Sequence, residues 1–201
     1  VLMNTSWVPF SRYIFNTVLV SICGTAGNLL FASLCAYALA KIKFPGHKWI
    51  FKTIRTSLMF HETVTAVTRF TIMSVLLLID TPLALIIPAF GSTLGLYLMK
   101  QFMETNVNDS VLESSRLDGA SEWKTFWVIA MPMVKPAWLT LIIYSFQGLW
   151  NAGASMYIYS EQYKSFNYAI GQILAGGIKR AGAGAASQVI MMLVPIIIFI
   201  I

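Results

Sequence analysis

The chain has 201 residues, of which 57% are hydrophobic and 11% are charged. Soluble globular domains carry about 25% charged residues, so this composition excludes an ordinary soluble domain and indicates an all-α membrane protein. The net charge of +6 does not indicate nucleic-acid binding, because the Lys and Arg residues lie between apolar runs. We therefore expect no nucleic-acid partner.

The first apolar segment, residues 12–40, has no charged residue between Arg12 and Lys41. A membrane helix needs about 20 apolar residues, so this segment is predicted to span the bilayer. Small residues recur every four positions along it, which favours close packing against another helix. They are Gly24, Asn28, Ala32, Ala36 and Ala40.

Five Lys and Arg residues follow between Lys41 and Arg55, and the positive-inside rule places this stretch in the cytoplasm. The apolar runs then predict a chain that crosses the membrane repeatedly. The turn Asp80-Thr81-Pro82 and the polar stretch around Glu161 and Lys164 are expected outside. The predicted spans are residues 12–40, 56–79, 82–100, 136–153 and 183–201, all in one transmembrane domain over 1–201.

The predicted span 56–79 is unusual because it carries His61, Glu62 and Arg69. Ionisable groups at membrane depth normally face a protein interior or water. Glu62 and Arg69 are therefore candidates for the lining of a substrate pathway. Pairing with groups on neighbouring helices or at the membrane surface is the alternative, and the sequence does not decide between them.

The most polar stretch is a predicted cytoplasmic loop over residues 104–132. Within it, Asp118-Gly119 is a turn signal, because glycine takes a positive φ without a Cβ clash. Apolar residues recur at helical spacing on both sides of this turn. The loop is therefore expected to form a helix, a glycine turn and a second helix. Ser110 and Glu113 also fit a capping box at a helix start, which is the simpler alternative role for Glu113.

This loop resembles the docking loop of bacterial ABC-importer permeases, whose pattern is Glu-Ala-Ala, three residues, Gly, nine residues, Ile, one residue, Leu-Pro. The chain keeps the Glu, Gly, Ile and Pro of that pattern and has serines for the two alanines and Met131 for the leucine. The loop residues carried over from the resemblance are Glu113, Ser114, Ser115, Asp118, Gly119, Ala120, Ile129 and Pro132.

A second stretch resembles the carbohydrate-uptake branch of these permeases, the maltose and oligosaccharide permeases. It comprises Asn16-Thr17, the run from Ala36 to Lys41, and Phe44-Pro45-Gly46. The resemblance departs from the family at His61-Glu62, where Pro-Gly is usual, and at Ala152, where the family often has Asp.

The resemblance implies a polytopic helical bundle of the type I importer kind, with five spans visible of six, one of them before Val1, and a tail after Ile201. It implies a multi-pass protein of the bacterial inner or plasma membrane, surrounded by lipid. The implied partners are a second homologous permease, a dimer of ABC ATPases that docks on the loop, and an extracellular solute-binding protein. The implied function is ATP-driven uptake of a sugar or oligosaccharide by alternating access.

The span 136–153 has a polar face, on which Tyr144, Gln147 and Asn151 fall with Thr140 and Gly148. Gln147 and Asn151 offer donors and acceptors for a hydroxyl-rich solute, and Trp150 at the edge offers a ring face for a sugar. These residues are candidates for the substrate pathway. The alternative is that the polar groups bond neighbouring helices.

Two rival functions remain open from sequence. One is a permease of the same superfamily for a polyamine, phosphate or amino acid. The other is an intramembrane enzyme that uses His61 and Glu62, although the chain lacks further convergent catalytic groups. No phosphate-binding loop of the G-x-x-x-x-G-K-[ST] type, no H-E-x-x-H and no G-x-S-x-G is present. We expect no catalytic residue, metal or cofactor, and ATP hydrolysis on a separate subunit.

Overall fold

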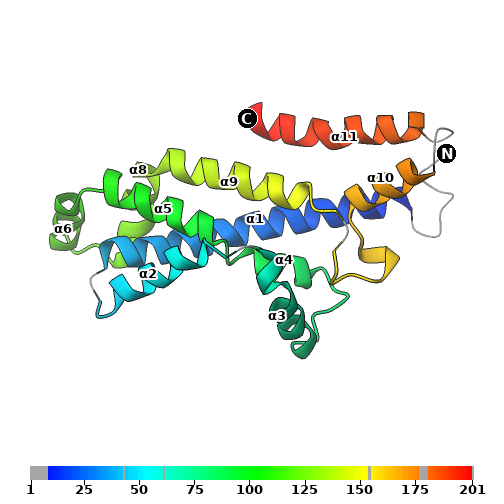
Figure 1. Cartoon of the computed structure of the whole chain (residues 1–201). Coiled ribbons are helices and arrows are strands. Elements are labelled where there is room, and N and C mark those ends of the chain that lie inside the picture. Colours follow the sequence, from blue (N-terminus) through cyan, green and yellow to red (C-terminus); the bar gives the residue numbers. More distant parts are fainter. Residues whose placement is uncertain (1–8, 43, 61, 154, 177–180, 201) are drawn as a thin grey trace. The chain divides into compact units, whose positions relative to one another are not determined.

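The computed structural model describes residues 9–42, 44–60, 62–153, 155–176 and 181–200 (Figure 1). Within these ranges the chain forms helices joined by turns. It packs as two compact units, one made of residues 1–24, 67–87 and 146–201 and the other of residues 25–66 and 88–145. The helices α1 (Phe10–Lys41) and α9 (Lys135–Trp150) contribute to both units.

The unit of residues 25–66 and 88–145 is built on small residues of α1. Ala32 and Ala36 are 3% and 0% exposed, because the small-residue stripe lets neighbouring helices approach closely. Large apolar side chains from α5 (Thr93–Asn106) and from residues 126–141 complete this core. The amphipathic α2 (His47–Ser57) lies beside α5, where Phe51 stacks on Tyr97 with ring centroids 5.9 Å apart.

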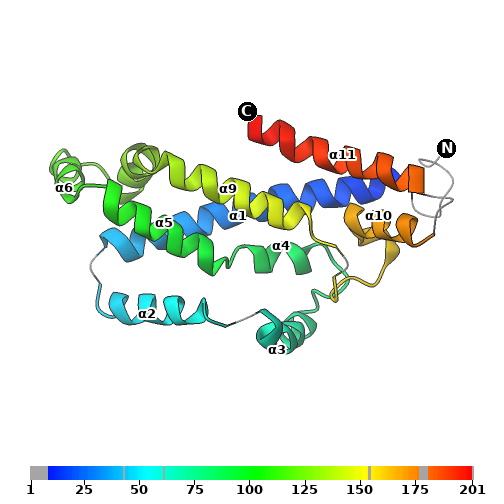
Figure 2. The same cartoon turned by 45° about the horizontal axis from the view of Figure 1, so that its top comes forward.

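The unit of residues 1–24, 67–87 and 146–201 has a smaller core. Phe10 and Tyr13 of α1 pack there against Phe166, Ala169 and Ile170 of α10 (Phe166–Ala175). The next helix, α11 (Ala181–Ile200), lies alongside α10 (Figure 2). A short 3₁₀ turn, η2 (Glu161–Tyr163), precedes α10.

Within the described ranges, two segments are long and apolar enough to cross a membrane, namely α1 and the stretch Leu83–Asn106. The latter joins α4 (Leu83–Ala89), which contains Pro88, to α5. A third follows if the pair Glu122–Met133 and Lys135–Trp150, bent by 83°, counts as one span. The all-helical, membrane-spanning class predicted from sequence is confirmed at this coarser level.

The predicted span 56–79 is not one helix. The structure ends α2 at Ser57 and begins α3 (Glu62–Val75) after a turn at residues 58–60. The hydroxyls of Thr53, Thr56 and Ser57 donate to carbonyls three or four residues earlier. Such bonds compete with the helix ladder, which is consistent with the break at this point. The helix α10 was not predicted, because its residues fall in a stretch interpreted as an outer loop.

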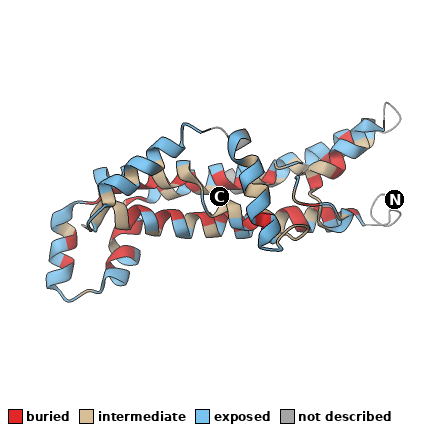
Figure 3. Cartoon of the chain, turned by 60° about the horizontal axis from the view of Figure 1, so that its bottom comes forward, coloured by how far each residue is buried: buried red, intermediate tan, exposed pale blue. Residues whose placement is uncertain are grey.

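Burial follows stripes along the helices, with buried residues on one side and exposed residues on the other (Figure 3). Large apolar side chains are exposed on α3 and α11. They include Val64 (69%), Val67 (77%) and Met192 (66%). Contiguous apolar exposure of this kind is typical of surfaces that contact lipid or another subunit.

Candidate functional site

The predicted docking loop contains a short, well-terminated helix, α6 (Asp109–Leu117). Gly119 follows it with φ +77°, and its N–H bonds to the Arg116 carbonyl at 3.0 Å. The Ala120 N–H bonds to the Ser115 carbonyl, also at 3.0 Å. This pair of bonds is the Schellman pattern, in which a glycine in the left-handed region ends the helix. The Asp-Gly signal therefore marks the turn that the sequence predicted.

One side of α6 faces outward and the other is buried. Glu113, Ser114 and Asp118 are exposed, and the Leu117 side chain is 88% exposed. Leu112 and Ser115 lie on the opposite side and are 2% and 6% exposed. Leu117 was not among the predicted site residues. Its charged neighbours Arg116 and Asp118 are a sequence signal that could have indicated an exposed leucine.

The capping-box alternative for Glu113 is wrong. Asn108 occupies the N-cap position of α6, and its side chain makes no capping bond. Ser110 lies inside the first turn and not before it. The helix starts two residues earlier than the sequence suggested, so Ser110 is not the N-cap residue that a capping box with Glu113 requires.

The buried side of α6 packs on an unusual helical turn. The Ser115 hydroxyl lies 3.2 Å from the Thr125 hydroxyl, and Thr125 is 0% exposed. Thr125 begins η1 (Thr125–Ala130), a π-helix that follows the short α7 (Glu122–Lys124). Ile129 is half-buried within η1, and Pro132 is exposed in α8 (Met131–Met133), where the chain bends into α9. Sequence periodicity did not predict the π-helix.

Charged side chains surround the junction of α6 with the end of α1. Lys41 Nζ lies 2.7 Å from Asp109 Oδ1, and Arg116 Nε lies 2.7 Å from Glu122 Oε1. The Tyr37 hydroxyl donates to Glu122 Oε2 at 3.0 Å. The hydrogen bond to Glu122 raises the pKa of Arg116, so its charge is retained. These partners are far apart in sequence, so no spacing rule could have paired them.

A hollow of about 350 Å³ lies at this junction. Both basic and acidic side chains line it, namely Lys41 and Arg116 together with Asp109, Glu113 and Glu122. The hollow brings Glu113, a predicted loop residue, together with Lys41, Asp109, Arg116 and Glu122, which were not predicted as site residues.

The predicted polar face of α9 is open on this chain. Gln147 and Asn151 are exposed, and Tyr144 is 55% exposed. Asn151 Nδ2 donates to the Gln147 carbonyl at 2.9 Å, and the Asn151 carbonyl accepts from Asn167 Nδ2 at 2.7 Å. Within the described residues, the side-chain amide of Gln147 makes no hydrogen bond to another helix.

Trp150 is placed differently from the prediction. Its side chain is 2% exposed, stacks on Phe146 and donates from Nε1 to the Met191 carbonyl at 2.9 Å. A buried indole with its N–H satisfied cannot offer a ring face to a solute. We therefore remove Trp150 from the pathway candidates.

Glu62 is the first residue of α3, and Arg69 is half-buried in the same helix. His61 and the side chain of Glu62 lie outside the described residues. In the searched part of the chain, no group of three or more His, Cys, Asp or Glu side chains could hold a metal ion.

A buried polar seam on α1 was also missed. Asn28 Nδ2 donates to Ser145 Oγ at 3.0 Å. Ser21 Oγ, Thr25 Oγ1 and Asn28 Oδ1 are buried without a hydrogen-bond partner among the described residues. Their spacing of four and three residues places them on one face of the helix. These polar residues are visible in the sequence of the first span, but its repeated small residues, Asn28 among them, were interpreted only as a surface for close helix packing.

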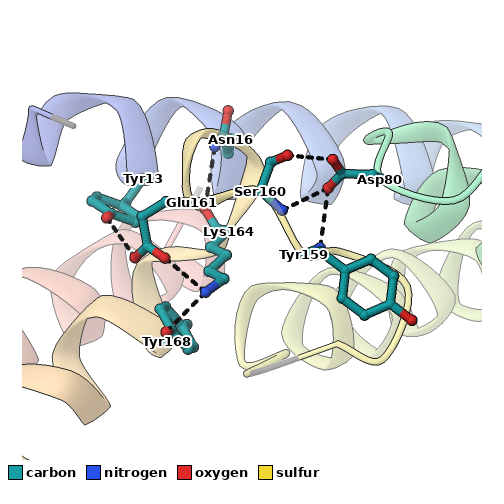
Figure 4. Close-up of polar contacts among 8 residues, drawn as sticks. All are labelled: Tyr13, Asn16, Asp80, Tyr159, Ser160, Glu161, Lys164 and Tyr168. Carbon is teal, nitrogen blue, oxygen red and sulfur yellow. Dashed lines mark hydrogen bonds and ion pairs between the residues drawn. The ribbon is translucent and has the colours of Figure 1, made fainter. Parts of the chain in front are cut away.

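The stretch after α9 forms a second polar cluster (Figure 4). Asp80, with φ +63°, accepts from the N–H groups of Tyr159 and Ser160 at 3.0 and 2.7 Å and from the Ser160 hydroxyl. The bonds from Ser160 hold the pKa of Asp80 below its ordinary value. Asn16 Nδ2 donates to the carbonyls of Gln162 and Lys164 at 2.8 and 3.2 Å.

The charged part of this cluster centres on Glu161. It accepts from the Tyr13 hydroxyl at 2.9 Å and lies 2.7 Å from Lys164 Nζ. Lys164 Nζ also donates to the Tyr168 hydroxyl at 2.9 Å (Figure 4). The bond to Glu161 raises the pKa of Lys164. Side chains of α1 and of the turn before α4 thus fix the segment between α9 and α10.

Known proteins share this architecture. A bacterial ABC transporter involved in the import of the acidic polysaccharide alginate has a similar fold, with a TM-score of 0.81 over 94% of this chain and 72% of that chain at 23% identity. At that identity the similarity shows the fold alone.

Related sequences give the family. The diacetylchitobiose uptake system permease protein NgcG of Streptomyces coelicolor is 30% identical over 142 residues, which is 70% of this chain and 47% of the relative. The sn-glycerol-3-phosphate transport system permease protein UgpE of Yersinia enterocolitica is 29% identical over 143 residues, which is 71% of this chain and 50% of the relative. This chain thus aligns with about half the length of these relatives. Residues 18–201 match the family described as binding-protein-dependent transport system inner membrane component, and the chain belongs to that family.

Proposed function

We propose that this chain is a multi-pass subunit of a bacterial ATP-driven, binding-protein-dependent importer. It forms part of the path for a sugar or oligosaccharide, with a second homologous permease completing the path in the lipid bilayer. ATP hydrolysis takes place on a separate ATPase dimer, and an extracellular binding protein delivers the solute. The observation that carries the proposal is α6, whose exposed side includes Glu113 and Ser114 of the docking pattern, whereas Ser115 of that pattern is buried.

The chemistry of α6 suits helix-in-groove recognition. Glu113, Ser114 and Leu117 lie within about 100° of one another around the helix, on the side opposite Leu112 and Ser115. Leu117 supplies an apolar anchor, Ser114 permits close approach, and Glu113 supplies a charge. An 88% exposed leucine between charged neighbours is suited to burial in a partner.

The docking role is tested by a glycine substitution with a matched control. Gly119 and Gly46 both have positive φ, +77° and +92°, and open space where a Cβ would stand. Gly119→Asp and Gly46→Asp therefore impose a similar backbone cost of about 1–2 kcal/mol. We expect only Gly119→Asp to abolish ATPase co-purification and uptake, while both proteins reach the membrane. Normal ATP-coupled uptake by Gly119→Asp would refute the docking role.

The solute class rests on the open polar face of α9 and on relatives. Gln147 presents a side-chain amide and Tyr144 a hydroxyl, which suit hydroxyl groups. NgcG is described as belonging to a diacetylchitobiose system and the structural neighbour to alginate import, which favour a carbohydrate. UgpE belongs to a glycerol phosphate system, so a phosphorylated polyol is the second candidate.

Uptake measurements on the complete transporter separate these candidates. We expect a neutral oligosaccharide, and not glycerol phosphate, to be transported and to compete for uptake. Gln147→Leu with Asn151→Leu should lower uptake about tenfold, as expected for one or two lost hydrogen bonds, with ATPase association intact. Leu139→Ala, on another side of α9, is the control. Unchanged uptake kinetics in the double variant would leave the polar face a packing surface.

A further inference from the structure

The start of α6 is bonded directly to the end of α1, and the end of α6 is linked to α1 through Glu122. Asp109, the first residue of α6, pairs with Lys41, the last residue of α1. Arg116, in the last turn of α6, pairs with Glu122, which accepts from Tyr37. Tyr37 and Lys41 are four residues apart, so they lie on one face of α1.

The Lys41 contact depends strongly on its partner. The Lys41 side chain is 6% exposed, whereas that of Asp109 is 71% exposed. A cation that has lost most of its water needs a nearby anion, because an unpaired buried charge is costly. Asp109 reaches in from α6 to supply that anion. The pairing therefore holds the start of α6 against α1 more firmly than an exposed ion pair would.

Glu122 joins three segments at the other end. It begins α7, bonds through Oε1 to Arg116 of α6 and accepts through Oε2 from Tyr37 of α1. The Tyr37 ring is 4% exposed and packs edge-on against Phe126, with centroids 5.3 Å apart. The packed ring keeps the hydroxyl aimed at the carboxylate. Glu122 is therefore held from two directions.

We propose that Tyr37, Lys41, Asp109, Arg116 and Glu122 form a two-point anchor that makes α6 and the end of α1 move as one rigid body. This inference rests on the proposed docking of α6. A displacement of α6 by its partner then passes directly to α1 through side chains. The main-chain connections on either side of α6, residues 107–108 and 118–121, therefore do not have to transmit the displacement alone. Glu122 is the positioning residue of this anchor.

The anchor is tested by pulsed electron paramagnetic resonance on the assembled transporter in lipid nanodiscs. Spin labels replace Leu30 of α1 and Ser110 of α6, both exposed, in a background of Cys23→Ser and Cys35→Ser. The anchor predicts one narrow distance that does not change between nucleotide-free and ATP-bound states. Asp109→Asn with Glu122→Gln should raise the population of a second, longer distance. We expect a twofold to fivefold rise, about what an exposed pair contributes, from loss of the Arg116–Glu122 pair, and a larger rise from loss of the Lys41–Asp109 pair.

Two further variants make the result specific. The exchange Arg116→Glu with Glu122→Arg, made with Asp109 intact, keeps an ion pair between the two positions, and the Tyr37 hydroxyl can then accept from the guanidinium. It should keep the single distance that Glu122→Gln alone weakens, which a general loss of folding would not allow. Glu113→Gln is the matched control. Glu113 lines the same hollow and makes no hydrogen bond or ion pair within the described residues. It should weaken ATPase association and leave the distance unchanged.

The outcomes separate the anchor from the docking proposal. If the labelled distance changes with ATP in the unmodified sequence, or stays narrow in the double variant, the anchor is refuted whatever Glu113→Gln does. If the distance behaves as expected but Glu113→Gln binds the ATPase normally, the anchor stands and the docking role of Glu113 fails.

Discussion

The helix α1 carries a polar cluster near each end. The cluster near its start adds bonds to main-chain atoms to the side-chain bond from Tyr13 to Glu161. Near its start, the side chains of Asn16 and Thr17 bond to main-chain atoms of residues 162–166 at 2.8–3.2 Å. Near its end, Tyr37 and Lys41 bond to side chains. The first cluster holds a loop and the second holds a helix that is proposed to bind a partner.

The difference is physical. A buried side chain that satisfies a main-chain group fixes the backbone itself, and breaking such a bond leaves a polar group without a partner. Exposed ion pairs contribute little and depend on salt. We infer that the segment 155–165 is fixed, whereas α6 is held firmly enough to transmit motion and loosely enough to adjust to a partner.

The largest expected effect is at Asn16. Asn16→Leu removes the donor of the Gln162 and Lys164 carbonyls from a residue that is 7% exposed. The free energy of unfolding should fall by about 2–3 kcal/mol, because two carbonyls lose their donor. Thermal unfolding of the purified protein measures it. Asn167→Leu, which removes one exposed bond to the Asn151 carbonyl, should cost less than about 1 kcal/mol. Equal losses would erase the distinction between buried and exposed contacts.

A pair of adjacent serines, Ser114 and Ser115, tests which side of α6 packs on the protein. Ser115→Leu should destabilise the protein by about 1–2 kcal/mol, because Ser115 is 6% exposed against Thr125 and a larger group overpacks the site. Ser114→Leu should leave unfolding unchanged within about 0.5 kcal/mol, because Ser114 is exposed. It should instead lower ATPase co-purification. If Ser114→Leu destabilises the protein and Ser115→Leu lowers ATPase co-purification instead, the buried and exposed sides of α6 are the reverse of those described.

Ionic strength should separate the two clusters. At about 1 M salt the Debye length falls to about 3 Å, so exposed ion pairs weaken. The exposed Arg116–Glu122 pair should weaken by less than about 1 kcal/mol, which broadens the distance between labels at Leu30 and Ser110. The Lys41 contact should be screened less, because the Lys41 side chain is 6% exposed. A distance between labels at Phe15 and Tyr159, both exposed, should keep its width. Broadening at both places, or at neither, would contradict the comparison.

The smallest expected effect is the pH response of Asp80. Its pKa lies below the ordinary 3.8 because Ser160 donates to it from its hydroxyl and its N–H. A lowered carboxyl pKa stabilises the folded state above the ordinary value, and this contribution is lost as the pH falls through the folded pKa. The protection factors of residues 157–160, which are exchange rates corrected for the intrinsic pH dependence of amide exchange, should thus be the same at pH 7 and pH 5. Asp80→Asn should accelerate exchange at both values, and unchanged exchange in this variant would remove Asp80 from the cluster.

The sequence predicted features that depend on neighbouring residues. The charge-free run from Arg12 to Lys41 is the helix Phe10–Lys41, because length and hydropathy suffice for a long membrane helix. Asp118-Gly119 is the turn after α6, because few residues take a positive φ. The start of α10 was also readable, since the Ser165 side chain caps it, but it was missed.

Features that depend on distant residues could not be predicted. The bond between Tyr37 and Glu122 joins positions 85 residues apart, and no periodicity relates them. The indole of Trp150 donates to the carbonyl of Met191, 41 residues away in sequence. A helical wheel gives the direction of the indole on its own helix but contains no information about such a distant partner. The break between α2 and α3 lies inside a run that hydropathy reads as one span.

The central claim, that α6 docks on an ATPase, is tested most directly at Leu117. A photo-activatable amino acid replaces Leu117, whose side chain is 88% exposed, in the complete transporter in intact cells. We expect a crosslink to the ATPase subunit, and none from the same group at Tyr159, which is 62% exposed near Asp80. Crosslinks from Leu117 to lipid or to the binding protein, without the ATPase, would contradict the account.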